Sequence, residues 1–143
     1  MKNFFMLALF LLCVGTVVEC TPKPPPVAYA DLEWKDDVYY KDGKPFSGVA
    51  TAEYSAGHPK GEYPLMDGRM HGVVREWWEN GQPSVETSFD MGQRNGSNKY
   101  WRKDGTIMKE QIYDHDKPVK TIHYDEKGKP HQDETSATQG TEK

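Results

Sequence analysis

The glycines of this chain recur every 24 residues, and this spacing limits the folds available to it. Moving the sequence along itself by 24 positions aligns Gly48, Gly72 and Gly96, then Gly57, Gly81 and Gly105, and then Gly68 with Gly92. Further aligned sets are Glu62, Glu86 and Glu110, and Leu65, Phe89 and Tyr113. A short fixed period is the signature of a repeat architecture, in which each unit packs mainly on its neighbours. We therefore expect a thin repeat domain rather than a thick closed core.

Each unit has the pattern of a β-hairpin. The segment 73–79 is rich in β-branched and aromatic residues and ends at Asn80-Gly81, a strong hairpin signal. The next unit repeats this design and ends at Asp104-Gly105. We predict a two-residue type I′ turn at each pair, because both central residues of that turn need positive φ. The other segments follow: return strands over 84–89 and 107–113, and looser connections over 68–72 and 92–96. The predicted fold class is all-β, a single-layer antiparallel β-meander of tandem hairpins.

The predicted turns also set which residues face each other across a hairpin. A two-residue turn at Asn80-Gly81 places Arg75 opposite Glu86, and the second turn places Lys99 opposite Glu110. Such pairs stabilise a register by about 0.2–1 kcal/mol each. Glutamates one unit apart would lie two strands away, roughly 9.5 Å, which is too far for both to chelate one ion. We interpret the glutamate column as structural and predict no metal site.

The composition agrees with a thin fold and argues against nucleic-acid binding. Only 36% of the 143 residues are hydrophobic, and a chain of this length has room for one small domain. The formal net charge of -4 includes no basic surplus of the kind that neutralises phosphates. Cys13 and Cys20 are the only cysteines in the sequence, so we expect no disulfide framework in the mature domain.

The N-terminal segment has the pattern of an export signal. Lys2 precedes a segment from Phe4 to Val18 that contains no charge and no proline, and Glu19 follows it. As a helix, this segment would rise roughly 22 Å, which is less than a hydrocarbon core of about 30 Å. We therefore expect cleavage, and a protein that acts in the periplasm, in the cell envelope or outside the cell.

Cys20 is a candidate for lipid attachment. The proline-rich stretch after it would make a stiff tether that holds a domain away from a membrane. Against this reading, Glu19 puts a carboxylate where a bacterial lipobox has a small residue. Both readings stay open, and we expect membrane contact only through such a lipid or through an uncleaved signal. The predicted organisation is a signal peptide over 1–20, a Pro-rich tether over 21–30, a repeat domain over 31–129 and a disordered polar tail over 130–143.

The repeat units resemble a known family. The string Trp78-Glu79-Asn80-Gly81-Gln82, and its counterpart Tyr100-Trp101-Arg102-Lys103-Asp104-Gly105, are similar to the bacterial variant of the MORN repeat. The opening segment 39–48 looks like the first unit of YwqK-like antitoxins. The resemblance covers roughly residues 37–129, and it implies a twisted single-layer sheet of successive hairpins that binds partners. Asp116 and Lys120 replace the glycines of the last unit, as expected for a terminal capping unit.

The sequence contains no catalytic pattern that we recognise. No glycine-rich loop opens a helix, no serine sits in a nucleophile elbow, and both cysteines lie in or beside the signal segment. No two histidines share a metal-ligand spacing on one strand or helix; they are His58, His71, His115, His123 and His131. We predict a protein that is not an enzyme and that uses no cofactor.

The tryptophans supply the candidate binding face. Trp77 and Trp101 hold equivalent places in adjacent hairpins, and strand alternation puts them on the face of Arg75 and Lys99. These four residues would form an amphipathic contact strip. The alternative is that the rings pack on each other and on Met108 to compensate for the thin core.

Two partner classes follow from these aromatic residues. Because Trp77 and Trp78 are neighbours in a strand, their side chains point to opposite faces, and we expect one of them to be accessible. We expect a protein partner, with an immunity role against an envelope-acting toxin as one form of this function. The alternative is a glycan-binding or structural envelope protein that stacks sugar rings on the spaced tryptophans. A fold alone does not decide between these functions.

Overall fold

The computed structural model describes residues 24–55 and 57–131. Within these residues the chain forms strands and one short 3-10 helix, and no α-helix. The elements in chain order are β1 Val27–Ala28, η1 Tyr29–Asp31, β2 Glu33–Lys35, β3 Val38–Lys41, β4 Lys44–Pro45, β5 Gly48–Ser55, β6 His58–Met66, β7 Arg69–Met70, β8 Gly72–Trp77, β9 Pro83–Asp90, β10 Gln93–Trp101, β11 Ile107–Asp114, β12 Lys117–Tyr124 and β13 Pro130–His131. In this part of the chain, no helix is long and apolar enough to cross a membrane.

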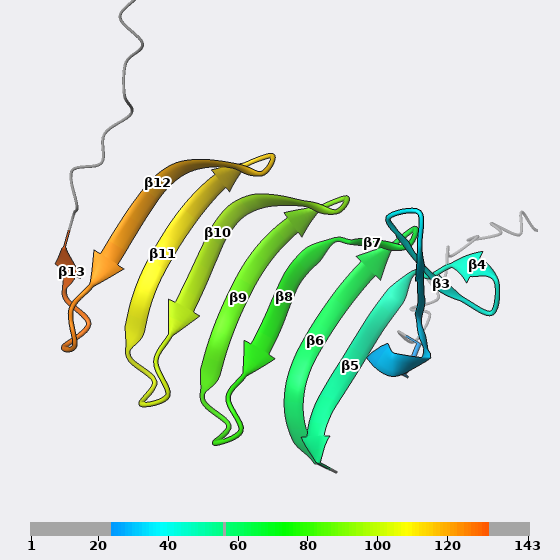
Figure 1. Ribbon diagram of the computed structural model, residues 1–143, viewed down its shortest axis with the longest axis horizontal. Helices are drawn as coiled ribbons and strands as arrows, with labels where there is room; N and C mark the ends of the chain where they lie inside the picture. The colour runs from blue at the N-terminus through cyan, green and yellow to red at the C-terminus, as the bar shows by residue number, and fades with distance from the viewer. Residues whose placement is uncertain (1–23, 56, 132–143) are drawn as a thin grey trace, which may run out of the picture.

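Ten of the described strands form one open, twisted sheet, which Figure 1 shows as a single layer. Its order is β1-β5-β6-β8-β9-β10-β11-β12-β13, with β7 paired to β6. Neighbours from β5 to β13 are antiparallel, whereas β1 joins β5 in parallel through Val27 and Ala28. The predicted all-β meander of successive hairpins is confirmed. The pairing of β1 begins inside the segment 21–30 that we assigned to a tether, while the predicted signal and most of the tail lie outside the described residues.

The predicted register is confirmed in both central hairpins. Arg75 lies opposite Glu86 between β8 and β9, and Lys99 lies opposite Glu110 between β10 and β11. On its other side, Lys99 is also the partner of Glu86. The charged residues therefore form one row across the strands.

The predicted type I′ turn at Asn80-Gly81 is wrong. Gly81 has φ 81°, but the φ of Asn80 is not positive. The Gly81 amide donates to the Trp78 carbonyl (2.8 Å), and the Trp78 amide donates to the Gln82 carbonyl (2.7 Å). This is a three-residue loop, a common hairpin connection that ends in a left-handed glycine. A bulge between Glu76 and Trp77 compensates for the extra residue, so the pairs further from the loop match a two-residue turn.

The hairpin that ends at Asp104-Gly105 has the same loop, and the I′ prediction is wrong there too. The Gly105 amide donates to the Arg102 carbonyl, and the Arg102 amide donates to the Thr106 carbonyl. The connections β5–β6, β8–β9, β10–β11 and β12–β13 lie along one end of the strands in Figure 1. We call this end the loop end.

In the main sheet, the two-residue turns with positive φ occur at the opposite end of the strands, which we call the turn end. They are Asp67-Gly68, Met91-Gly92 and His115-Asp116. The residues that flank each turn pair directly, as Asp90 does with Gln93. We predicted looser connections over 68–72 and 92–96, and the structure corrects this. The glycine at the end of each predicted connection lies at an irregularity in the strand that follows a tight turn. At Gly96 (φ 102°), for example, the register shifts between Arg94 and Asn98, as in a β-bulge.

The turns at the turn end are bonded one to the next. Each donates a backbone amide to the carbonyl of a residue in the preceding unit: Gly68 to Phe46 (2.8 Å), Gly92 to Met70 (2.8 Å) and Asp116 to Arg94 (2.9 Å). The three donors lie 24 residues apart. Hairpins are thus joined at their turns in addition to their strand pairing.

The core is thin and partly polar. The buried hydrophobic residues in the described part of the chain are Val49, Ala50, Leu65, Val74 and Tyr113. Near the middle of the sheet, Thr87 and Asn98 are also buried, and the Thr87 hydroxyl donates to Asn98 Oδ1 over 2.8 Å. Because few apolar side chains are buried, the hydrogen bonds between paired strands and between hairpins must contribute much of the stability of the fold.

A second, three-stranded sheet packs at the turn end beside β5 to β7. Its strands run in the order β2-β3-β4, and the Tyr39 amide on β3 donates to the Gly68 carbonyl over 2.8 Å. Gly68 has φ 74°, and a Cβ built on it would lie 2.3 Å from Val38 Cγ1 and 2.7 Å from the Tyr39 carbonyl oxygen. Only glycine combines this backbone conformation with so close an approach. The Tyr29 ring packs between Tyr39 and Tyr63, with ring centroids 5.5 Å and 4.6 Å away.

Candidate functional site

Two of the four residues predicted as a contact strip have charged partners inside the protein. Arg75 lies between two carboxylates, 3.9 Å from Glu62 and 3.5 Å from Glu86. Lys99 Nζ lies 4.0 Å from Glu110 Oε1. These side chains are partly solvated, so each pair contributes about 0–1 kcal/mol. The row mainly fixes the register, and its charges are compensated before any partner arrives.

The other two predicted residues, Trp77 and Trp101, are half-buried at the loop end. Each follows a register shift, between Glu76 and Trp77 on β8 and between Tyr100 and Trp101 on β10. After a bulge, simple alternation no longer determines which face a side chain takes. The shared face of Trp77 and Trp101 therefore stays a prediction, and so does their role in binding. Trp78 is half-buried too, so neither member of the Trp77-Trp78 pair is fully accessible.

A column of hydrogen-bond donors joins the hairpins at the loop end. Its members, Tyr54, Trp78 and Arg102, are spaced 24 residues apart. The Tyr54 hydroxyl donates to the Trp77 carbonyl (3.0 Å), and Trp78 Nε1 donates to the Trp101 carbonyl (3.2 Å). Arg102 continues the series by donating to the carbonyls of the next unit, at 3.0 and 3.1 Å. Each bond holds a side chain of one hairpin against the backbone of the next.

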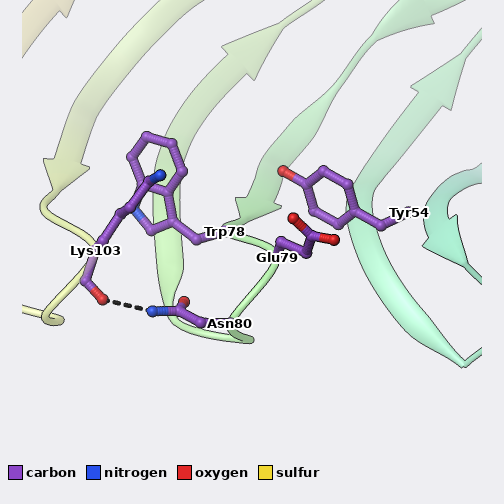
Figure 2. Close-up of a pocket in the computed structure, with 5 residues that line it drawn as sticks. All are labelled: Tyr54, Trp78, Glu79, Asn80 and Lys103. Atoms are coloured by element: carbon purple, nitrogen blue, oxygen red, sulfur yellow. Dashed lines mark hydrogen bonds between the residues drawn. The ribbon is translucent and has the colours of Figure 1, made fainter.

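A hollow of about 570 Å³ lies beside the first two members of this column. Its lining residues are Tyr54, Trp78, Glu79, Asn80 and Lys103. Figure 2 shows Tyr54 and Trp78 on either side, Glu79 between them and Lys103 beside the Trp78 ring. The Asn80 amide donates to the Lys103 carbonyl over 2.7 Å, so the β8–β9 loop is tied to the next loop. The hollow therefore spans three successive hairpins.

The polar ends of the two aromatic residues are occupied, while parts of their rings remain open. Tyr54 is 42% exposed, although its hydroxyl is bonded. Lysine ammonium groups lie near both rings, Lys60 at 5.6 Å from the Tyr54 centroid and Lys103 at 5.5 Å from the Trp78 centroid. Glu79 is exposed and makes no hydrogen bond or ion pair with any other residue that the structure describes. The site presents fixed rings, two cations and one uncompensated carboxylate.

Sequence reasoning missed this arrangement because the three donors differ in chemical type. A tyrosine, a tryptophan and an arginine are different residue types, so their alignment is less evident than that of the identical glycines and glutamates. The signal was nevertheless present, since all three side chains can donate a hydrogen bond and all lie at the 24-residue spacing.

Three of the histidines in the described residues have local partners that fix their rings. His58 Nδ1 lies 2.8 Å from Ser55 Oγ, His71 Nδ1 lies 3.3 Å from Asp90, and His115 Nδ1 contacts Asp114 at 2.6 Å. No group of three or more metal-binding side chains gathers within the part of the chain that the structure describes. Cys20, the candidate for lipid attachment, lies outside that part.

Comparisons with protein-family models, with curated proteins and with solved structures gave no match. The site thus places two fixed aromatic rings beside unlike charges.

Proposed function

We propose that this protein is an exported, non-enzymatic binding module that holds a protein partner at the loop end of its sheet. The observation that carries this proposal is the fixed position of Tyr54 and Trp78. Each ring is held by a bond to the following hairpin, so little side-chain freedom is lost when a partner docks. Tyrosine and tryptophan are also enriched among the residues that dominate binding energy at protein interfaces.

The charges at the hollow support recognition of a protein. Glu79 has no partner among the described residues, and Lys103 contacts only the Trp78 ring through its ammonium group. By contrast, Arg75 and Lys99 already face carboxylates. Uncompensated charges at the rim of an interface determine orientation and partner choice. The hollow is therefore the primary contact in this proposal, and the strip of Trp77, Trp101, Arg75 and Lys99 is a second face.

Within this proposal, the chain is a relative of the bacterial MORN-type repeat proteins that its sequence resembles. Repeat modules present extended binding surfaces made of equivalent positions in successive units, and Tyr54 and Trp78 are such positions. The signal pattern of residues 1–20 supports an envelope or extracellular location. An immunity role against an envelope-acting toxin is the form of protein binding that agrees with export and with the resemblance to YwqK-like antitoxins.

Site-specific photo-crosslinking in the native host tests this proposal. A photoreactive residue at Lys60, beside Tyr54, is compared with one at Lys117, an exposed lysine at the start of β12 and at the other end of the strands. We expect a discrete crosslinked protein from position 60 only. The product should disappear when Tyr54→Ala is added, provided that circular dichroism shows an unchanged sheet. Equal products from both positions, or a product that survives Tyr54→Ala, would contradict the proposal.

A glycan ligand is the second candidate, and one observation favours it. Two ring faces lie beside an amide and a carboxylate in a single hollow, and aromatic faces with adjacent planar polar groups suit a sugar ring. Titration with soluble cell-wall glycan fragments distinguishes the candidates through tryptophan fluorescence. A saturable change that Trp78→Leu removes would favour the glycan, whereas no change alongside specific crosslinking would favour the protein partner.

A further inference from the structure

A second hollow, of about 300 Å³, lies at the turn end of the sheet. It forms where the small sheet meets the turns of the first two hairpins. The residues that line it include Trp34, Asp37, Tyr39, Arg69, Met70 and Met91. We call it the Trp34–Met91 pocket. It is separate from the hollow at the loop end, and no residue lines both.

Trp34 is the most accessible tryptophan in the described part of the chain. It is 55% exposed, although burial of a tryptophan side chain would be strongly favourable. The ring is nonetheless held in place, because it packs on Tyr39 with ring centroids 4.4 Å apart. The Tyr39 backbone is fixed in turn by the hydrogen bond that its amide donates to the Gly68 carbonyl. The pocket thus has an apolar wall that is both positioned and open.

Met91 breaks a local rule in the same pocket. It is the first residue of a two-residue turn and has φ 45°, a conformation in which glycine, asparagine and aspartate are favoured. The first residues of the other turns with positive φ are Asp36, Asp42, Asp67 and His115, so Met91 is the one apolar residue at such a position among the described turns. Met91 is also among the exposed large hydrophobic residues, at 37%. At this position a methionine adopts an unfavourable backbone conformation and also exposes its apolar side chain. Such a residue is expected where the side chain has a binding role.

Two charges in the lining have no partner among the residues that the structure describes. Arg69 on β7 and Asp37 in the β2–β3 turn make no ion pair or side-chain hydrogen bond with any described residue. They are opposite in sign, and both are exposed. The pocket therefore combines an apolar lining of Trp34, Met70 and Met91 with one free cation and one free anion.

From these features we propose that the Trp34–Met91 pocket binds a peptide segment of a partner protein, in which an apolar side chain is flanked by an acidic and a basic residue. The apolar side chain contacts Trp34 and Met91. The acidic residue pairs with Arg69, and the basic residue pairs with Asp37. The fixed indole and the mobile thioethers suit an aliphatic side chain, because methionine adapts to the shape of its partner. This inference does not depend on the proposed role of the loop end.

The first test asks whether Met91 is kept for contact or for packing. Met91→Asn places a residue that tolerates positive φ in the turn. If the side chain serves a partner, the variant has an equal or higher urea midpoint than the parent protein. Asp67→Asn, in the equivalent turn of the preceding unit, is the matched control and should leave the midpoint nearly unchanged. A lower midpoint for Met91→Asn would overturn the proposal, because it would show that the methionine stabilises the fold.

The second test measures binding directly with a defined probe. The peptide acetyl-Gly-Glu-Leu-Lys-Gly-amide is titrated into the protein while the Met70 and Met91 methyl signals and the Trp34 indole signal are followed by NMR. One control peptide replaces leucine with serine, and the other replaces both charged residues with glutamine. We expect saturable shifts with the probe and about tenfold weaker binding with the serine control, since the leucine side chain then contributes nothing. Arg69→Gln should weaken binding of the probe but leave that of the glutamine control unchanged. Absence of saturable shifts, or equal affinity for all three peptides, would overturn the proposal.

Discussion

Gly68 carries the contact between the two sheets, and Gly68→Ala is the perturbation that tests this most directly. An ideal Cβ at this position lies 2.3 Å from Val38 Cγ1 and 2.7 Å from the Tyr39 carbonyl oxygen. Overpacking of this kind costs about 1–3 kcal/mol, and the positive φ of 74° adds about 1 kcal/mol for alanine. Displacement of the backbone also weakens the hydrogen bonds of Gly68 with the Tyr39 amide and the Phe46 carbonyl. Each of these contributes about 0.5–1.5 kcal/mol. We expect a total loss of about 3–5 kcal/mol.

Gly81→Ala is the matched control for this prediction. Gly81 has nearly the same φ, 81°, but no atom lies within 4 Å of its ideal Cβ. Only the backbone cost of about 1 kcal/mol therefore applies. Urea unfolding followed by tryptophan fluorescence gives both free energies of unfolding. A difference of less than about 1 kcal/mol between the two variants would refute the reasoning, because it would mean that the close approach at Gly68 carries no energetic weight.

Hydrogen exchange adds a spatial test of the same prediction. Contacts in a repeat fold are mostly between neighbouring units, so Gly68→Ala should speed exchange in β2 to β4 and in the first hairpin much more than in β11 and β12. A uniform increase in exchange along the chain would contradict this expectation, because it would show that the sheet unfolds as one cooperative block.

Three further predictions concern the titrating and charged groups. The Arg94 guanidinium, which donates to Asp116 over 2.8 Å, holds the pKa of that carboxyl below its ordinary 3.8. The ion pair therefore stabilises the fold fully above pH 3.8, and this stabilisation is lost as pH falls through the lowered pKa. NMR titration of the Asp116 carboxyl measures that pKa. Burial raises the pKa of Tyr29 and Tyr63 above 10.0, so their contribution to stability is complete below pH 10 and is lost as pH rises above it. Ultraviolet difference spectra should show that these two phenols ionise above pH 10. Arg75→Glu places a third carboxylate between two glutamates and should lower stability by about 1 kcal/mol or less, an effect that high salt reduces.

The hairpins and their register were predictable because they depend on local patterns. The 24-residue spacing and the β-rich segments between glycines located the four central strands of the main sheet, β8 to β11. The turn type at Asn80-Gly81 was not predictable from the pair alone, since a type I′ turn and a three-residue loop with a compensating bulge give the same Arg75–Glu86 pairing. Hydrophobic periodicity does not report such compensation.

The two hollows depend on contacts between units, which the 24-residue spacing alone does not reveal. The hollow at the loop end forms because donors in one unit reach the backbone of the next, so it appears only when adjacent hairpins are in place. The Trp34–Met91 pocket needs the small sheet, whose docking on Gly68 joins residues far apart in the chain. One signal was readable, since Met91 precedes glycine in a turn where its counterpart in the unit before is Asp67.

The bonds at the two ends of the strands have a mechanical consequence. At the turn end, each unit donates to the one before it, as Gly92 does to Met70; at the loop end, each donates to the one after it, as Trp78 does to Trp101. Two attachments at opposite ends of a strand pair resist both splaying and relative rotation of neighbouring hairpins. The main sheet is therefore stiff between neighbouring hairpins, although no second layer of the described residues covers it. Side chains at equivalent positions in neighbouring units keep a constant separation and orientation. A partner that contacts two units must therefore match that separation.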